Sequence, residues 1–211
     1  MQKDSRLETI LVMQGGGSLG AYECGAYKTL VKHDIKFDIV SGTSIGAINA
    51  AIIAGAKTNN PVQELEDFWL TIAETATSLV HDKIRPVLSS TYGALWGIPH
   101  VFRRTCFFSY INYFTFFISP HLYDLSPLKE TLSKFIDFGK FSDRDRQRLI
   151  ITSTDIQNSE SVTFDSRRMS IDADHVISCA AFPFYGISWT KKTGGICGMV
   201  VYRVTHHLGR L

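Results

Sequence analysis

Residues 9–22 read TILVMQGGGSLGAY, a short apolar run that stops at three consecutive glycines. A run of this length, rich in β-branched residues and ended by glycine, is typical of a buried strand that leads into a tight loop. From about Gly20 to Val31 apolar residues recur at helical spacing, which predicts a helix directly after the loop. We therefore expect the order strand, glycine loop, helix.

The next unit holds a serine between two glycines. Phe37 to Val40 reads as a short apolar strand, and it leads to Gly42-Thr43-Ser44-Ile45-Gly46. The almost wholly apolar, alanine-rich stretch Ile48 to Ala56 is typical of a buried helix. A chain that starts in the order βαβα favours parallel strands, so we expect an α/β sandwich with a mainly parallel central sheet.

Further along, the same patterns predict three more helices and a hairpin. The helices are expected over Pro61–Thr77, Pro127–Ile136 and Asp174–Ala181, and the paired strands over Arg148–Asp155 and Ser161–Asp165. Between them, Ser89 to Leu125 is rich in aromatic rings and interrupted by arginines, and it is too short and too polar to span a membrane. Two interpretations stay open for this segment: an aromatic insertion in the core, or a lid whose rings and cations meet lipid headgroups.

The composition bounds the class of protein. With 211 residues, 45% of them hydrophobic and 20% charged, the chain fits one globular domain. The net charge of +2 and the scattered Lys and Arg residues argue against a nucleic-acid partner. The cysteines are widely spaced, so we expect reduced thiols and no metal site. The polar start, Met1 to Glu8, lacks the pattern of a secretory signal, so we expect a cytoplasmic protein.

Ser44 is the candidate nucleophile. Gly42 and Gly46 leave room for a strained turn between strand and helix that pushes the serine hydroxyl into a cleft. The helix that starts there aims its positive end at the site, which favours negative charge on an attacked ester oxygen. The alternative is that Ser44 only caps the helix. No histidine further along lies in a recognisable catalytic setting, so a mechanism without histidine has to be considered.

The glycines also fit a second kind of loop. Gly15, Gly17 and Gly20 satisfy the pattern G-x-G-x-x-G of dinucleotide-binding folds. Such folds need an acidic residue near the end of the second strand to hold the ribose. Asp38 stands at the beginning of that expected strand, and Gly42 follows its end. The dinucleotide interpretation is therefore the weaker one.

Two motifs together resemble the signature of bacterial patatin-like phospholipases. They are Gln14-Gly15-Gly16-Gly17-Ser18-Leu19-Gly20-Ala21-Tyr22 and, after a short spacing, Gly42-Thr43-Ser44-Ile45-Gly46-Ala47. The likeness extends to Ile177–Phe184, and the aromatic middle of the chain matches least. The resemblance implies a patatin-like three-layer sandwich, a lipid or phospholipid substrate met at a membrane surface, and no cofactor. It also implies a Ser-Asp dyad in which Ser44 attacks the ester while backbone amides of the loop hold the oxyanion, namely those of Gly15, Gly16, Gly17 and Ser18.

The aspartate of that dyad has no counterpart in the tail. The resemblance predicts Asp-Gly-Gly or Asp-Gly-Ala shortly after Pro183, yet no aspartate of this chain is followed by glycine. When each new codon takes the last base of one codon and the first two of the next, the codons of residues 198–201 can encode Asp-Gly-Gly. Lys191-Lys192 would be encoded by an A-rich run prone to slippage. We therefore expect the acyl hydrolase domain over residues 1–191, incomplete at its C-terminus, and an out-of-frame tail over residues 192–211. The alternative function is a catalytically impaired remnant that binds lipid surfaces.

Overall fold

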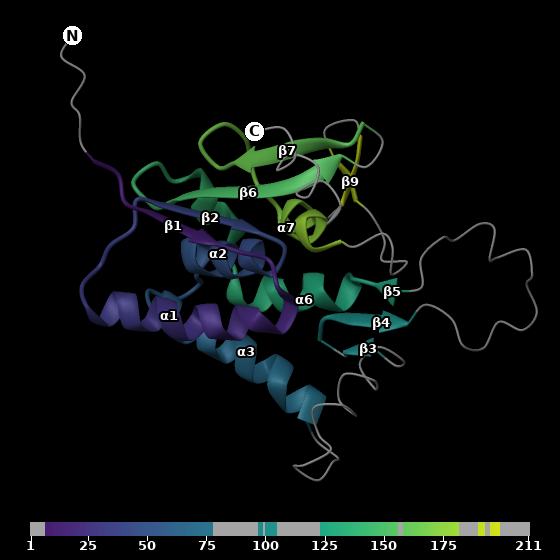
Figure 1. Cartoon of the computed structure of the whole chain (residues 1–211), viewed down its shortest axis with the longest axis horizontal. Coiled ribbons are helices and arrows are strands. Elements are labelled where there is room, and N and C mark those ends of the chain that lie inside the picture. The colour runs from purple at the N-terminus through teal and green to yellow at the C-terminus, as the bar shows by residue number, and fades with distance from the viewer. Residues whose placement is uncertain are drawn as a thin grey trace, which may run out of the picture.

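The computed structural model describes residues 7–77, 97–98, 100–104, 123–155, 158–181, 190–192 and 195–198. Its main sheet has the strand order β1-β2-β6-β9-β8, with β7 also paired to β6, and a small sheet has the order β3-β4-β5 (Figure 1). The strands are β1 (Ile10–Met13), β2 (Ile39–Thr43), β3 (Gly97–Ile98), β4 (Phe102–Arg104), β5 (Tyr123–Asp124), β6 (Arg148–Asp155), β7 (Glu160–Asp165), β8 (Thr190–Lys192) and β9 (Gly195–Gly198). The α-helices are α1 (Gly20–Lys32), α2 (Ile45–Gly55), α3 (Pro61–Thr77), α6 (Ser126–Phe135) and α7 (Ala173–Ala180), and short 3₁₀ helices cover Gly17–Leu19 and Phe138–Ser142.

The main sheet is mostly parallel. β1 pairs with β2 and β2 pairs with β6 in parallel, so that Met13 lies opposite Gly42 and Thr43 lies opposite Thr152. β7 and β9 run antiparallel to β6, and β8 runs antiparallel to β9. Strands β1, β2, β6 and β8 therefore point the same way, which confirms the expected α/β fold. The carboxyl ends of β1 and β2 meet at one edge of the sheet, so the glycine loop and the serine turn become neighbours.

The expected elements are present, with small shifts at their ends. α3 and β6 have the expected bounds, and α1 begins at Gly20 as expected. β2 begins at Ile39 rather than Phe37 and continues through Thr43, because its last residues keep pairing with β6. Most of the aromatic segment Ser89–Leu125 lies outside the described residues. Among the helices that the structure describes, none is both long and apolar enough to cross a membrane.

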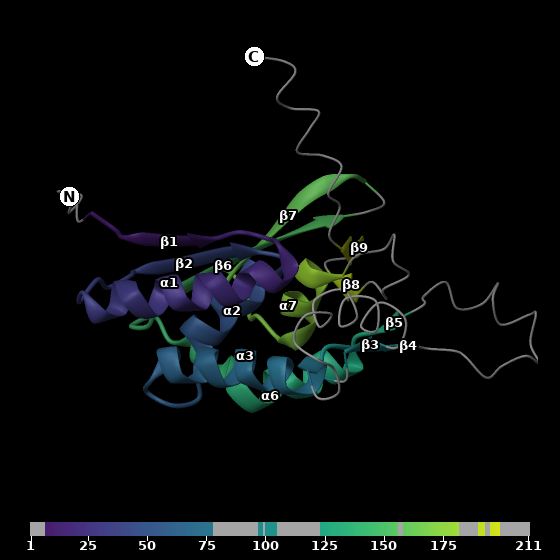
Figure 2. The same ribbon diagram turned by 60° about the horizontal axis from the view of Figure 1, so that its bottom comes forward.

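The helices pack against one face of the sheet. All helices labelled in Figure 1 lie on the same side of β1, β2 and β6, and Figure 2 shows the same arrangement after a turn. α2 lies directly against the sheet, and every residue from Gly46 to Gly55 is buried, as expected. It shares one hydrophobic core with the fully buried strand residues Val40, Leu149 and Ile151. α3 and α6 lie beyond α2, so the described residues form a sheet and two tiers of helices.

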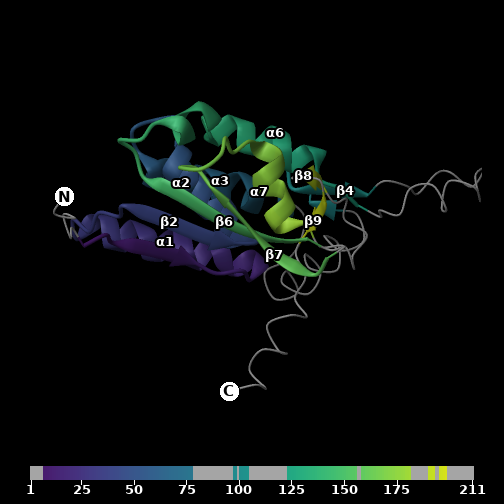
Figure 3. The same cartoon turned by 90° about the horizontal axis from the view of Figure 1, so that it is seen from above.

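On the opposite face of the sheet, strand β1 carries exposed apolar side chains, and Figure 3 views the sheet from that side. On β1, Ile10 is 52% exposed and Val12 is 66% exposed, whereas Met13 is only 4% exposed. The expectation that the whole β1 run is buried is therefore wrong. β1 is the edge strand, and its alternate side chains point away from the helices in the described part of the chain.

An ion pair joins the start of β6 to the end of β7. The side chain of Asp165 is 8% exposed and accepts hydrogen bonds from Nε of Arg148 at 2.9 Å and from the amide of Arg167 at 3.0 Å. The bond from Arg148 is the main cause that lowers the pKa of Asp165 below its ordinary value of 3.8, with a smaller contribution from that amide. The pair therefore makes stability depend on pH.

We expect Asp165→Asn to lower the free energy of unfolding by about 1–3 kcal/mol at pH 7, because charge-assisted hydrogen bonds to a buried carboxylate are lost. A carboxyl group with a lowered pKa in the folded state contributes stability above its unfolded pKa and loses it as the pH falls through its folded pKa. The gap between wild type and variant should therefore narrow below about pH 4. Urea unfolding at pH 7 and at intervals below pH 4 measures this gap, and an unchanged gap would refute the assignment.

Candidate active site

The turn that carries Ser44 joins β2 to α2. Ser44 is partly buried and has φ 57° and ψ −127°, a region in which a non-glycine residue is strained. Its side chain makes no capping hydrogen bond, although its carbonyl oxygen accepts one from the amide of Ala47 at 2.9 Å. A capping serine has an extended backbone and accepts a helix amide through its hydroxyl. The helix-cap interpretation is therefore wrong, and the turn has the strained backbone between strand and helix that a nucleophile elbow would need.

Close backbone contacts require both glycines of this turn. A Cβ atom on Gly42 would lie 2.2 Å from the carbonyl oxygen of Gly46, and one on Gly46 would lie 2.5 Å from the carbonyl oxygen of Met13. Both distances are far below van der Waals contact, so no side chain fits at either position. The approach of Gly46 to Met13 and Gln14 also places the serine turn against the start of the glycine loop.

The glycine loop has backbone amides that no other group of the described chain uses. The amide of Gln14 donates to Oε1 of Glu23 at 2.7 Å, and the amides after the loop bond to loop carbonyl oxygens. Between them, the amides of Gly15–Ser18 donate to no group among the described residues. Gly17 has φ 59°, a conformation that glycine adopts at no steric cost. The loop thus supplies a run of exposed donors beside the turn of Ser44.

Three side chains that the sequence did not single out hold the two ends of the loop. Nδ2 of Asn49 on α2 donates to the carbonyl oxygen of Gly20 and to Oε2 of Glu23, both at 3.0 Å. Nε1 of Trp69 on α3 donates to Oδ1 of Asn49 at 3.1 Å. These bonds satisfy the amide of Asn49, which is fully buried. The sequence did carry a signal, because a lone Asn inside an alanine-rich buried helix needs polar partners.

The third glycine of the loop motif serves packing. A Cβ atom on Gly20 would lie 2.6 Å from both Ile45 and Trp69, so only glycine lets α1 approach α2 and α3 this closely. Asp38, the acid that a ribose would need, accepts a hydrogen bond from the amide of Thr9 at 2.9 Å. Thr9 precedes β1, so Asp38 lies at the opposite end of this strand from the loop. This position leaves the dinucleotide interpretation without its ribose ligand.

The side chains of His175, Cys24 and Cys179 have structural surroundings. His175 is 6% exposed, completes a capping box with Asp172 at the start of α7, and packs its ring 4.7 Å from that of Phe164. Cys24 and Cys179 are buried and form no disulfide, and burial raises the pKa of the Cys24 thiol. In the described ranges, no three His, Cys, Asp or Glu residues form a group that could hold a metal ion. His81 and His121 lie outside these ranges.

Strand β9 ends near the serine turn. It pairs with the last two residues of β6, and β7 occupies the other edge of β6 at the same two residues. A strand has only two edges for pairing, so β9 must pair with the same edge of β6 as β2 does. On this edge, Thr43 of β2 is opposite Thr152, and Gly198 of β9 is opposite Thr154. Two residues of strand separate these positions by about 7 Å. Gly198, where the expected Asp-Gly-Gly of the other codon phase would begin, is thus close to Ser44.

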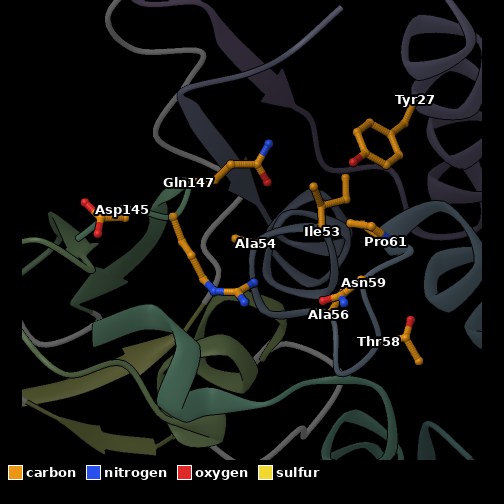
Figure 4. A pocket seen from close by; sticks show the side chains of 10 residues that line it. Tyr27, Ile53, Ala54, Ala56, Thr58, Asn59, Pro61, Asp145 and Gln147 are labelled. Atoms are coloured by element: carbon orange, nitrogen blue, oxygen red, sulfur yellow. The ribbon is translucent and has the colours of Figure 1, made fainter. Parts of the chain in front are cut away.

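Figure 4 shows a pocket at the far end of α2. Its lining includes Ile53, Ala54 and Ala56 from that end of the helix, together with Arg146 and Gln147 before β6. Ser44 precedes the first residue of α2, and the 11 residues of this helix span about 16 Å. The pocket is therefore separate from the site around Ser44.

Comparisons with known proteins agree on one family. A family model described as patatin-like phospholipase matches residues 11–199. Over 102 residues, 48% of the chain, the sequence is 33% identical to patatin-like phospholipase domain-containing protein 7 of Rattus norvegicus. Over 45 residues, 21% of the chain, it is 42% identical to triacylglycerol lipase SDP1L of Arabidopsis thaliana. These matches cover 7% and 6% of the two relatives, so the chain corresponds to a small part of each.

A solved structure has a similar fold. The crystal structure of VipD from Legionella pneumophila superposes with a TM-score of 0.52 at 13% sequence identity. The superposition covers 91% of this chain and 45% of that of VipD. At this identity the similarity concerns the fold alone.

Proposed function

Because this chain belongs to the patatin-like phospholipase family, we propose that it is a serine hydrolase that cleaves acyl esters of phospholipids or other lipids. One observation carries the proposal: the strained turn of Ser44 touches the start of a loop with free amides. A nucleophile beside oxyanion donors is what acyl transfer from an ester requires. The names of the relatives, a triacylglycerol lipase and a phospholipase-domain protein, support a lipid ester as the substrate.

In the proposed reaction, Oγ of Ser44 attacks the ester carbonyl carbon and loses its proton to a base. The oxyanion of the tetrahedral intermediate accepts hydrogen bonds from amides of Gly15–Ser18, and the positive end of α2 favours the same charge. The intermediate collapses to an acyl-serine, and the alcohol leaves with the proton returned by the base. Water then attacks the acyl-serine, which releases the fatty acid and restores the hydroxyl. The substrate is met at a membrane surface by a peripheral protein, and no cofactor takes part.

The base in this proposal is the aspartate that the family resemblance implies. It belongs to the Asp-Gly-Gly encoded in the other codon phase across residues 198–201, which places a reading-frame shift near Lys191. If the tail as written is the expressed one, Ser44 has no such partner and is a weakly activated alcohol. The chain is then an impaired remnant that holds lipid without turnover. Assignment to the bacterial branch of the family rests on the spacing of the two motifs and belongs to the same proposal.

A fluorophosphonate probe, which bonds covalently to activated serines, tests the nucleophile. We expect labelling of the wild-type protein at Ser44 and none in Ser44→Ala, because among the described residues no other serine combines the strained turn with the loop amides. Ser41→Ala removes a partly buried serine on β2 and should label like the wild type. Mass spectrometry of the labelled peptide identifies the site.

The outcomes separate the two functions. Labelling that persists in Ser44→Ala would refute Ser44 as the nucleophile. A folded wild-type protein that binds phosphatidylcholine vesicles without labelling would favour the impaired remnant over the active hydrolase.

A further inference from the structure

Glu23 lies in the first turn of α1, and its carboxylate reaches back to the start of the glycine loop. One oxygen, Oε1, accepts a hydrogen bond from the amide of Gln14 at 2.7 Å, and the other, Oε2, accepts one from Nδ2 of Asn49 at 3.0 Å. Gln14 is the first residue after β1, and Asn49 belongs to the helix that begins after Ser44. We propose that Glu23 is a positioning residue that fixes the glycine loop relative to Ser44.

The loop has few other anchors. Residues 14–19 are exposed, and the amides of Gly15–Ser18 bond to no group of the described chain. At the far end of the loop, the carbonyl oxygen of Gly20 accepts a hydrogen bond from Nδ2 of Asn49 at 3.0 Å. An exposed segment with few bonds opens easily unless its ends are held. Glu23 and Asn49 hold both ends to α2, so the free amides keep one position relative to the nucleophile.

The side chain at this position needs two acceptors at the right reach. A carboxylate offers an acceptor oxygen to each of two donors, and its charge shortens and strengthens both bonds. A Gln side chain keeps one acceptor for the amide of Gln14. An Asp side chain keeps the charge but is one methylene shorter, so it withdraws from both donors. Comparing Glu23→Gln with Glu23→Asp therefore separates geometry from charge.

The experiment compares wild type with Glu23→Ala, Glu23→Asp and Glu23→Gln. Glu66→Ala is the control. Glu66 on α3 forms an exposed ion pair with Lys28, which lies on α1 like Glu23. Amide hydrogen exchange by NMR measures how strongly the backbone amides of Gln14 and the loop glycines are protected. The rate of phosphonate labelling measures the reactivity of Ser44, and the dependence of this rate on probe concentration separates probe binding from the labelling step. Thermal unfolding checks that each variant is folded.

Glu23→Ala and Glu23→Asp should each speed exchange at Gln14 by roughly 10- to 100-fold, the effect of losing a charge-assisted hydrogen bond. They should also slow the labelling step by about 10²-fold without changing probe binding, as when an oxyanion donor is misplaced. Glu23→Gln should lie closer to wild type than either of them in both measurements, and Glu66→Ala should match wild type.

Two results would overturn the positioning role. One is unchanged exchange at Gln14 in folded Glu23→Ala or Glu23→Asp. The other is faster exchange with unchanged labelling. The catalytic consequence rests on the proposed function, whereas the fixing of the loop does not. If the wild-type protein is not labelled by the phosphonate, Ser44 is not an activated nucleophile and the proposed function is refuted. The role of Glu23 is then decided only by the rate of amide exchange at Gln14 and the loop glycines.

Discussion

Gly42→Ala is expected to leave little folded protein. The added Cβ atom would lie 2.2 Å from the carbonyl oxygen of Gly46 and 2.3 Å from its carbonyl carbon. Both are backbone atoms within the first turn of α2, so no side-chain rotation relieves the clash. Relief requires β2 to move away from a helix that is buried along its length. We expect the free energy of unfolding to fall by about 4 kcal/mol or more, much of the stability of an ordinary domain.

The same substitution at Gly25 is the control. Gly25 lies inside α1, is exposed, and a Cβ atom there would meet nothing within 4 Å. Gly25→Ala should raise the free energy of unfolding by up to about 1 kcal/mol, because alanine loses less backbone entropy in a helix. Urea unfolding followed by circular dichroism measures both variants. A Gly42→Ala variant as stable as wild type would mean that the serine turn is not built as described.

These glycines also explain why the serine turn could be predicted from sequence. The requirement for glycine at positions 42 and 46 is local and steric, so it leaves a mark in the sequence itself. Helical periodicity is equally local, and it gave α3 its observed bounds. The strained backbone of Ser44 follows from the same short turn.

Features that depend on distant partners could not be predicted in this way. β1 reads Ile10, Leu11, Val12, Met13, apolar at every position, so no alternation tells which face the helices cover. The bond from Asn49 to Glu23 joins residues 26 apart in the chain. Only the unusual Asn among alanines hinted at it. β9 is formed by Gly195–Gly198, whose two glycines disfavour a strand, and its place on β6 is set by long-range pairing.

The place of β9 leads to the prediction with the largest change in activity. In a gene with the natural codons that encodes the chain as written, inserting one base into the codons of Lys191-Lys192 should change the tail to the phase expected to encode Asp-Gly-Gly across residues 198–201. Gly198 is opposite Thr154 on the same edge of β6 where Thr43, the neighbour of Ser44, is opposite Thr152. An aspartate encoded there would be close enough to act on the serine as its base. Hydrolysis of a fatty-acid p-nitrophenyl ester should then rise by about 10⁴-fold, the usual effect of completing a catalytic dyad or triad.

Two variants of the restored chain test whether the gain comes from the dyad. Changing the new aspartate to asparagine keeps the restored tail and its packing, so hydrolysis should fall back to the level of the chain as written if the carboxylate is the base. Ser44→Ala in the restored chain should have the same result, because the two groups act as a unit and their losses do not add. If the asparagine variant keeps the gain, the restored tail acts through folding and the base lies elsewhere. A folded restored chain with no gain at all would mean that the other codon phase does not supply the base.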